Sequence, residues 1–200
     1  MHAKKFFALV LVAATTSAAP IDEGVQARQS CADVAVFFAR GTTEPGTLGT
    51  IIGPGFQTAL RGALGTRSLT FTGINYPATI AGFLAGGDAG GARTMANSVT
   101  STASSCPNTK LVISGYSQGA QLVHLAAAQL SATVQNRVVA AVTFGDPNRD
   151  KALPGVLQGR RKTFCAAGDL ICTGSAIVLP PHLSYGANAQ EAASFVVARV

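Results

Sequence analysis

Short apolar runs alternate along the chain with longer segments in which apolar residues recur at helical spacing. The runs are rich in Val, Ile and Phe, which is typical of buried strands. Strands are therefore expected at residues 34–39, 69–74, 110–114 and 137–144, with a weaker one at 162–165. Helices are expected at residues 53–64, 90–104 and 118–130, with a last one starting near Asn188. Asn188 and Glu191 have the spacing of a capping box at that start.

Strands that alternate with helices indicate a mainly parallel central sheet with helices on both faces. The fold class expected is α/β, a compact three-layer sandwich of the α/β-hydrolase type. The connection over residues 145–161 is long and contains Pro and Gly, and loops of that kind are often functional. No insertion is large enough to form a bulky lid. One domain over residues 31–200 accounts for the pattern.

The first residues have the pattern of a secretory signal peptide. Lys4 and Lys5 precede a short apolar run, and small residues follow up to Ala19. The run is shorter than the roughly 20 apolar residues that a membrane-spanning helix needs. We therefore expect a signal peptide at 1–19, secretion to the extracellular space and no membrane anchor. Residues 20–30 are polar and are expected to form a pro-segment or flexible arm.

Composition excludes some classes of function. Hydrophobic residues make up 48% of the 200 residues and charged residues 12%, which suits a packed core and not a disordered chain. The formal net charge is +6, but the basic residues are scattered apart from Arg160, Arg161 and Lys162. No basic stripe interleaved with aromatic residues is present, so nucleic-acid binding is not expected. The basic triplet is interpreted as part of a solvated loop.

Four cysteines in a secreted chain indicate two disulfides, for which three connectivities exist. Cys165 and Cys172 are close in sequence and are expected to pair, which leaves Cys31 with Cys106. A metal site is the alternative, but no Cys-x-x-Cys or His-x-x-x-His spacing supports it.

The strongest motif is Gly-Tyr-Ser-Gln-Gly at residues 115–119, between an expected strand and an expected helix. That context is the one a nucleophile elbow requires. Ser117 would stand on a sharp turn, and the glycines at 115 and 119 leave no Cβ to clash there. The backbone N–H of Gln118, at the positive end of the helix, could donate to a developing oxyanion. A capping Ser in a Gly-rich turn is the bland alternative.

A serine nucleophile needs a base, and two histidines lie in the expected domain. His124 is seven residues along the helix from Ser117, about 10 Å at 1.5 Å per residue, and is interpreted as a packed or capping side chain. His182 lies in a Pro-Pro-His loop near the end of the chain. The order Ser, acid, His of α/β-hydrolases favours His182 as the base.

The carboxylate that orients the base must come from between Ser117 and His182, where Asp146, Asp150 and Asp169 lie. Asp146 ends an expected strand and is a serious rival on topology. Asp169 lies between two cysteines, and a short disulfide would hold its loop rigid, as a catalytic carboxylate requires. The residues alone favour Asp169 without excluding Asp146.

Four segments in order resemble the cutinase family of fungal serine esterases: residues 40–46 (RGTTEPG), 115–120 (GYSQGA), 168–174 (GDLICTG) and 182–186 (HLSYG). The resemblance spans nearly the whole mature chain. It implies Asp169 as the acid of the triad and the pairs Cys31–Cys106 and Cys165–Cys172. It also implies Thr42 as an oxyanion-hole residue beside Gln118, at a position where the family commonly has Ser.

The resemblance further implies an exposed nucleophile, an apolar rim in place of a lid, and no metal or organic cofactor. The rim residues expected are Leu84, Ala176, Val178 and Leu183. Such a rim suits a cutin-type polyester or a long acyl ester that lies across the surface. The activity expected is hydrolysis of cutin-type aliphatic polyesters and short-chain acyl esters through a Ser-His-Asp acyl-enzyme mechanism, by an enzyme that acts as a monomer.

Two segments, 74–78 (INYPA) and 144–147 (FGDP), look closer to the related acetylxylan esterases. Those enzymes usually carry more cysteines than the four in this chain, which favours cutinase again. Deacetylation of a wall polysaccharide is the alternative activity. A secreted binding or effector protein that has lost the chemistry is the alternative from another class, and the intact Ser117, Asp169 and His182 argue against it.

Overall fold

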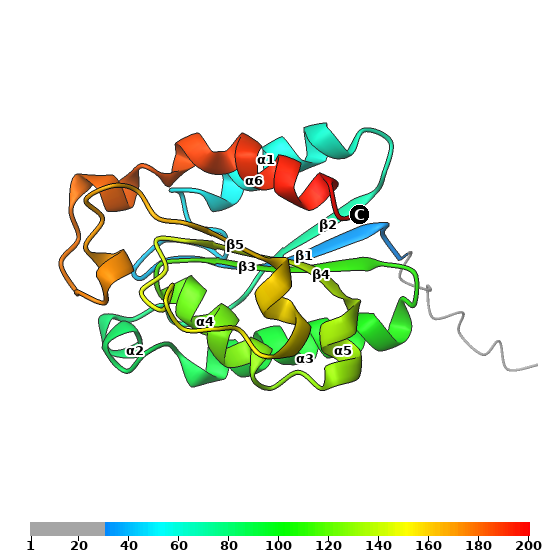
Figure 1. Ribbon diagram of the computed structural model, residues 1–200, viewed down its shortest axis with the longest axis horizontal. Helices are drawn as coiled ribbons and strands as arrows, with labels where there is room; N and C mark the ends of the chain where they lie inside the picture. The colour runs from blue at the N-terminus through cyan, green and yellow to red at the C-terminus, as the bar shows by residue number, and fades with distance from the viewer. Residues whose placement is uncertain (1–30) are drawn as a thin grey trace, which may run out of the picture. The chain divides into compact units, whose positions relative to one another are not determined.

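The computed structural model describes residues 31–200, which form an α/β unit around one parallel sheet (Figure 1). The strand order is β2-β1-β3-β4-β5, and every neighbouring pair is parallel. The strands are β1 (Val34–Ala39), β2 (Leu69–Gly73), β3 (Lys110–Tyr116), β4 (Val138–Phe144) and β5 (Arg161–Phe164). The α/β class and the parallel sheet expected from the sequence are confirmed.

The strands form where apolar side chains can be buried on both faces of the sheet. All six residues of β1 are buried, as are nearly all of β3 and β4, whereas the edge strands β2 and β5 are only partly covered. Continuous apolar runs of this kind are typical of parallel strands covered on both sides.

Helices cover the two faces of the sheet, as Figure 1 shows. On one face lie α1 (Gly53–Leu64) and α6 (Ala189–Val197), which pack with Phe38 and Phe144 in one core cluster. On the other face lie α3 (Ala89–Ser105), α4 (Gln118–Ala127) and α5 (Ala132–Arg137), which pack with Phe37 and Ile113 in a second cluster. The sheet is therefore the middle layer of three.

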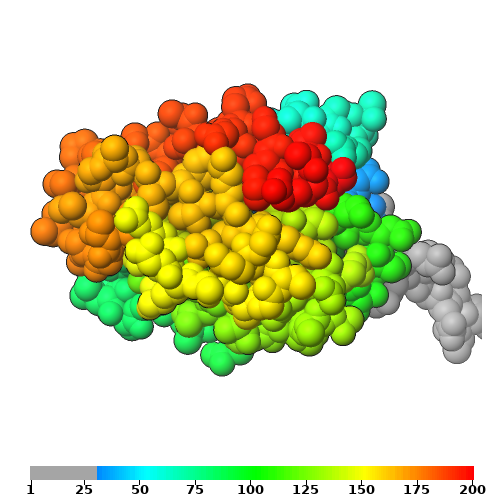
Figure 2. Space-filling model, viewed as in Figure 1, coloured from blue at the N-terminus to red at the C-terminus, as the bar shows by residue number. Residues whose placement is uncertain are grey.

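Short helical segments lie mainly in the loops at the carboxyl ends of the strands. The orange loops after β5 and the short helix α2 gather at the left end of the view in Figure 1. The short segments are α2 (Ile80–Leu84), η2 (Ile171–Thr173), η3 (Pro180–Leu183) and η4 (Tyr185–Asn188), and η1 (Gly155–Arg160), which leads into the start of β5. In Figure 2 the last third of the chain, yellow to red, covers most of the visible face of the unit.

Two expectations about helices were wrong, and one helix was missed. The helix expected at 118–130 ends at Ala127, and a separate helix, α5, begins after Ser131, whose hydroxyl accepts from the N–H of Val134. The helix α2 was not expected at all. Asn188 makes no side-chain cap on α6, because η4 leads directly into that helix, and Glu191 pairs instead with Lys162.

The basic triplet at 160–162 is not part of a solvated loop. Arg160 donates to the carbonyl oxygens of residues 135, 136 and 138, and Arg161 donates to those of residues 149 and 151. Arg160 thus joins the end of η1 to α5 and the start of β4, and Arg161 joins β5 to the loop before η1. Because both guanidinium groups satisfy main-chain acceptors, they do not form a free basic patch.

Both disulfides join the expected pairs. Cys31–Cys106 connects the start of β1 to the end of α3, and Cys165–Cys172 closes the loop after β5. The signal peptide expected at 1–19 and the segment expected at 20–30 lie outside the described residues. Within residues 31–200, no helix is long and apolar enough to span a membrane.

Candidate active site

Ser117 stands in a sharp turn between β3 and α4 with a strained backbone, φ 57° and ψ −118°. Non-glycine residues adopt positive φ rarely, and such strain gathers at functional sites. A Cβ at Gly115 would meet the carbonyl oxygen of Gly119 at 2.1 Å, and a Cβ at Gly119 would meet that of Ala39 at 1.9 Å. The turn therefore requires both glycines, as the motif predicted. The N–H of Ser117 donates to the carbonyl of Phe144 on the neighbouring strand β4.

His182 lies in η3 and faces the serine. Its Nε2 is 2.9 Å from Ser117 Oγ, and the imidazole is buried. Tyr116 Oη donates to the main-chain oxygen of His182, and the two rings lie 5.0 Å apart between centroids at 30°. The ring of Tyr185 meets the imidazole edge-on at 6.0 Å. Two aromatic rings and one hydrogen bond thus hold the imidazole against the serine.

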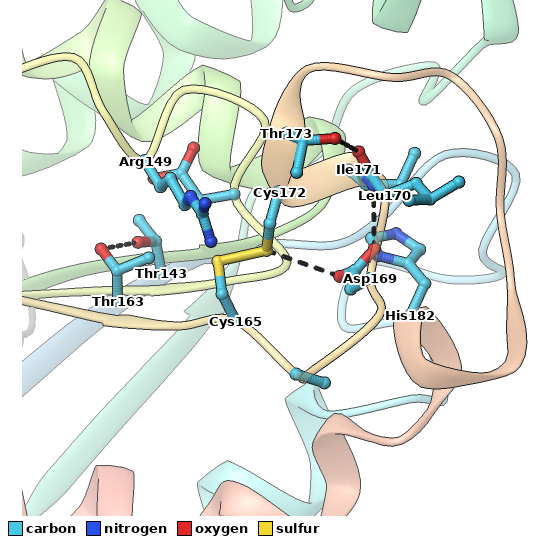
Figure 3. Close-up of a disulfide and its surroundings, with 12 residues drawn as sticks. Thr143, Arg149, Thr163, Cys165, Asp169, Leu170, Ile171, Cys172, Thr173 and His182 are labelled. Carbon is cyan, nitrogen blue, oxygen red and sulfur yellow. Dashed lines mark hydrogen bonds and ion pairs between the residues drawn. A yellow bond between two sulfur atoms is a disulfide. The ribbon is translucent and has the colours of Figure 1, made fainter.

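Asp169 lies beside His182 in the loop that the Cys165–Cys172 disulfide closes (Figure 3). Its Oδ2 is 2.8 Å from His182 Nδ1, and a disulfide sulfur, Cys172 Sγ, lies 3.6 Å from the same oxygen. The N–H of Ile171 donates to Oδ1. The carboxylate is buried, so these contacts replace water around its charge.

Tyr185 is a partner of Asp169 that sequence reasoning missed. Its phenol donates to Asp169 Oδ2 and accepts from the N–H of Ala166. Burial raises the pKa of the Tyr185 phenol above its usual range, and the hydrogen bond to the Asp169 carboxylate adds to that rise. The phenol therefore stays protonated and remains a donor to the carboxylate.

The rival carboxylate, Asp146, lies after β4 and faces α4, away from His182. Asp146 Oδ2 is 3.0 Å from His124 Nε2, and neither residue contacts the Ser117 hydroxyl. Asp150 is exposed at the surface beside Arg149. Among the three carboxylates considered, Asp169 is the one that the structure brings to His182.

Thr42 lies in the loop after β1, where three main-chain N–H groups converge on one carboxylate. Glu44 accepts from the N–H of Gly41, Thr50 and Ile51 at 2.7–2.9 Å. The neighbouring Arg40 is buried and donates to the carbonyls of Glu44 and Tyr76. This network fixes the loop next to the serine. No pattern in the sequence indicated this role of Glu44.

Gln118 reaches Thr42 through its side chain. Its amide nitrogen donates to Thr42 Oγ1 at 2.9 Å and to the carbonyl of Thr79 at 2.8 Å. Because Thr42 Oγ1 accepts this bond, the proton of the Thr42 hydroxyl is free to point elsewhere. The N–H of Gln118 is the first of α4, so no carbonyl within the helix can accept from it. The structure thus places two potential donors near Ser117.

An open cleft of about 530 Å³ lies over Ser117 and His182. Thr42 and all four expected rim residues line it, together with apolar side chains of α2 that the sequence did not indicate. Leu84 is 67% exposed, Val178 56% and Leu183 54%, so the rim is apolar and uncovered. The further apolar lining residues are Ile51, Ile80, Phe83 and Ile171.

These contacts form one chain of hydrogen bonds from a carboxylate through an imidazole to a hydroxyl, at the base of an apolar cleft. Such an arrangement can activate a hydroxyl for attack on a carbonyl carbon. Within residues 31–200, no group of three His, Cys, Asp or Glu side chains could hold a metal ion.

Comparison with known proteins gives the family. The family model for cutinase matches residues 30–200. Cutinase CUT1 of Coprinopsis cinerea is 58% identical over 192 residues, which is 96% of this chain and 96% of that protein.

Two solved structures show how this fold compares. The Trichoderma reesei cutinase in complex with a C11Y4 phosphonate inhibitor has a TM-score of 0.80 and 45% identity, over 84% of this chain and 76% of that one. The catalytic core of a Trichoderma reesei acetyl xylan esterase is more distant, with a TM-score of 0.66 and 26% identity over 85% of this chain and 100% of that one. The chain therefore belongs to the cutinase family and is a carboxylic ester hydrolase.

Proposed function

We propose that the protein is a secreted cutinase that cleaves cutin-type aliphatic polyesters and short acyl esters by way of an acyl-enzyme on Ser117. The observation that carries this proposal is the unbroken contact of Asp169, His182 and Ser117 at the base of an apolar cleft without a lid. The pattern of residues 1–19 supports secretion. The proposal includes action as a monomer, because the triad and the cleft are complete within one chain.

His182 is the general base of the first step. Asp169 accepts a hydrogen bond from the Nδ1–H of His182, which leaves the lone pair of Nε2 facing Ser117 Oγ. As the serine oxygen bonds to the ester carbonyl carbon, its proton passes to Nε2. The imidazolium then gives this proton to the leaving alcohol, and the acyl group remains on Ser117.

Water completes the cycle. His182 takes a proton from a water molecule, whose oxygen attacks the acyl carbonyl carbon, and the proton returns to Ser117 Oγ as the carboxylic acid leaves. In both steps the carbonyl oxygen gains negative charge. The Thr42 hydroxyl and the Gln118 N–H stabilise that charge, because they are already oriented before the substrate binds.

The apolar rim selects the substrate. Leu84, Val178 and Leu183 expose their side chains around the cleft, and Ala176 lines it beside them. An aliphatic chain that lies across these residues removes apolar surface from water, at about 25 cal/mol for each Å². A polyester strand benefits more than an acetyl group, whose apolar surface is small. The lower identity to acetyl xylan esterase agrees with this preference.

The experiment compares p-nitrophenyl acetate, butyrate and palmitate with acid release from suspended polycaprolactone and cutin. We expect strong turnover of butyrate and release of acid from both polymers, with Ser117→Ala as the background control. Hydrolysis of acetate alone, with no release from either polymer, would contradict the polyester assignment. Failure to react with an organophosphonate would contradict the catalytic role of Ser117 itself.

A further inference from the structure

A second histidine–aspartate pair lies in the unit, at the end of β4, between the strands that precede Ser117 and Asp169. His124 is on α4, and its Nε2 is 3.0 Å from Oδ2 of Asp146 in the loop after β4. The Asp146 side chain is fully buried and that of His124 is 10% exposed. The other oxygen of Asp146 accepts from the N–H of Asn148 at 2.8 Å. Neither residue lines the cleft, and the mechanism above uses neither.

The residues next to Asp146 contact the triad directly. The carbonyl of Phe144 accepts from the N–H of Ser117. Gly145, at φ +54°, lies so close to the catalytic imidazole that a Cβ there would meet His182 Cε1 at 2.6 Å and Nδ1 at 2.9 Å. Three successive residues thus have three roles: Phe144 binds the serine N–H, Gly145 packs against the catalytic imidazole, and Asp146 binds His124.

The pair is also a second link between α4 and the end of β4. Ser117 immediately precedes α4, and His124 is two turns further along that helix. The helix is therefore attached to the β4 strand end at two points, by Ser117 at its start and by His124 in its body. Gly145 lies in sequence between the two β4-side partners, Phe144 and Asp146, and is packed against the imidazole of His182.

We propose that His124 and Asp146 are positioning residues, whose hydrogen bond holds the β4 loop so that Gly145 keeps His182 aligned with Ser117. The inference rests on the proposed role of the triad. It assigns a function in the reaction to a buried pair that contacts no substrate.

The physical argument begins with the buried carboxylate. If His124 is removed, Asp146 keeps one main-chain donor, and a buried charge with too few partners is costly. The loop then shifts to bring the carboxylate to water, and Gly145 moves with it. A misplacement of about 1 Å in a catalytic group can lower the rate about 100-fold. Substrate binding is unaffected, because the cleft is lined by other residues.

The first test uses two variants of His124. His124→Leu removes the donor at similar size, whereas His124→Gln places an amide nitrogen near the position of Nε2. We expect kcat per active site to fall about 10-fold or more in His124→Leu, with KM for p-nitrophenyl butyrate within about 2-fold of the unmodified enzyme. His124→Gln should recover most of the lost kcat. Equal losses in both variants would overturn the proposal.

The second test separates positioning from stability and covers the case in which His124→Leu does not fold. In the double variant His124→Leu/Asp146→Leu no buried charge remains, so the melting temperature should recover toward that of the unmodified enzyme. The proposal requires kcat per site to stay low in this variant. Recovery of kcat together with the melting temperature would overturn it. Asp150→Leu removes an exposed carboxylate from the same loop and is the matched control.

Active sites are counted by titration with an organophosphonate before each rate is measured. Stoichiometric labelling of Ser117 in the unmodified enzyme, located by peptide mapping, tests the triad independently of His124. If Ser117 is not labelled, the proposed function is overturned. If Ser117 is labelled but kcat per site is unchanged in His124→Leu and in the double variant, only the positioning role is overturned.

Discussion

The side-chain amide of Gln118 donates a hydrogen bond to the hydroxyl of Thr42 at 2.9 Å, and so joins the residue after the nucleophile to the loop after β1. The same nitrogen donates to the carbonyl of Thr79, which caps α2 at the edge of the cleft. One amide therefore fixes both the Thr42 hydroxyl and the start of a rim helix.

Thr42→Val tests the hydroxyl as an oxyanion donor, because valine keeps the shape of threonine and has a methyl group in place of the hydroxyl that also accepts from the Gln118 amide. We expect kcat to fall about 100- to 1,000-fold, the usual cost of losing one preorganised donor. Thr42→Ser keeps the hydroxyl and is the matched control, with kcat close to that of the unmodified enzyme. Equal activity of the Val and Ser variants on p-nitrophenyl butyrate would show that the hydroxyl takes no part.

Tyr185→Phe removes the phenol that donates to Asp169 and keeps the ring that packs against His182. Without this donor the Asp169 carboxylate is held less firmly against His182, and because a small misplacement of a catalytic group lowers the rate, we expect kcat/KM to fall about 10-fold or more. The folded structure should persist, as judged by circular dichroism. A kcat/KM equal to that of the unmodified enzyme would mean that His182 and Ile171 alone hold the carboxylate.

Gly145→Ala places a methyl group against the catalytic imidazole. Gly65 has a similar φ of +64° but has open space where its Cβ would lie, so Gly65→Ala also places an alanine at positive φ, without the contact. The positive φ should lower the unfolding free energy of both variants, and the contact with His182 should lower that of Gly145→Ala further. Only Gly145→Ala should lose most of its esterase activity. Similar activity in the two variants would contradict the close approach of Gly145 to His182.

The chain has three tyrosines, and burial raises the pKa of all three, Tyr76, Tyr116 and Tyr185. Below about pH 10, the usual pKa of tyrosine, both the folded and the unfolded chain keep the phenolic protons, so these three groups do not change the free energy of unfolding. Above that pH the unfolded chain loses protons that the folded chain retains, so the free energy of unfolding falls as pH rises.

An alkaline titration checks this sign. Tyrosinate absorbance should appear only together with the loss of the far-ultraviolet circular dichroism of the folded unit. Gradual ionisation centred near pH 10, with the circular dichroism unchanged, would contradict the burial of the three phenols.

The sheet could be predicted from the sequence because parallel strands buried on both faces leave continuous apolar runs, as in β1 and β4. The short helices could not. α2 and α5 have five and six residues, too few to establish a helical period, and their starts depend on single caps at Thr79 and Ser131. The failed cap at Asn188 has a similar cause, since a preceding turn of 3₁₀ helix leaves no free helix end to cap.

For the site too, some residues could be predicted from the sequence and others could not. The Gly-x-Ser-x-Gly motif and the order of acid and histidine indicate candidate residue types, because both depend on local turn geometry and chain order. Which carboxylate faces which histidine depends on packing, so the residues alone favoured Asp169 over Asp146 and the family resemblance decided between them. Contacts across the fold, such as that of Tyr185 with Asp169, leave no local signal.

The most direct test of the account is the hydrolysis of p-nitrophenyl butyrate by Ser117→Ala. The change removes one oxygen atom and leaves the turn, its two glycines and the buried histidine in place. We predict a loss of about 10⁴-fold or more in kcat, with an unchanged melting transition. Activity near that of the unmodified enzyme in the folded variant would contradict Ser117 as the nucleophile, and with it the acyl-enzyme mechanism.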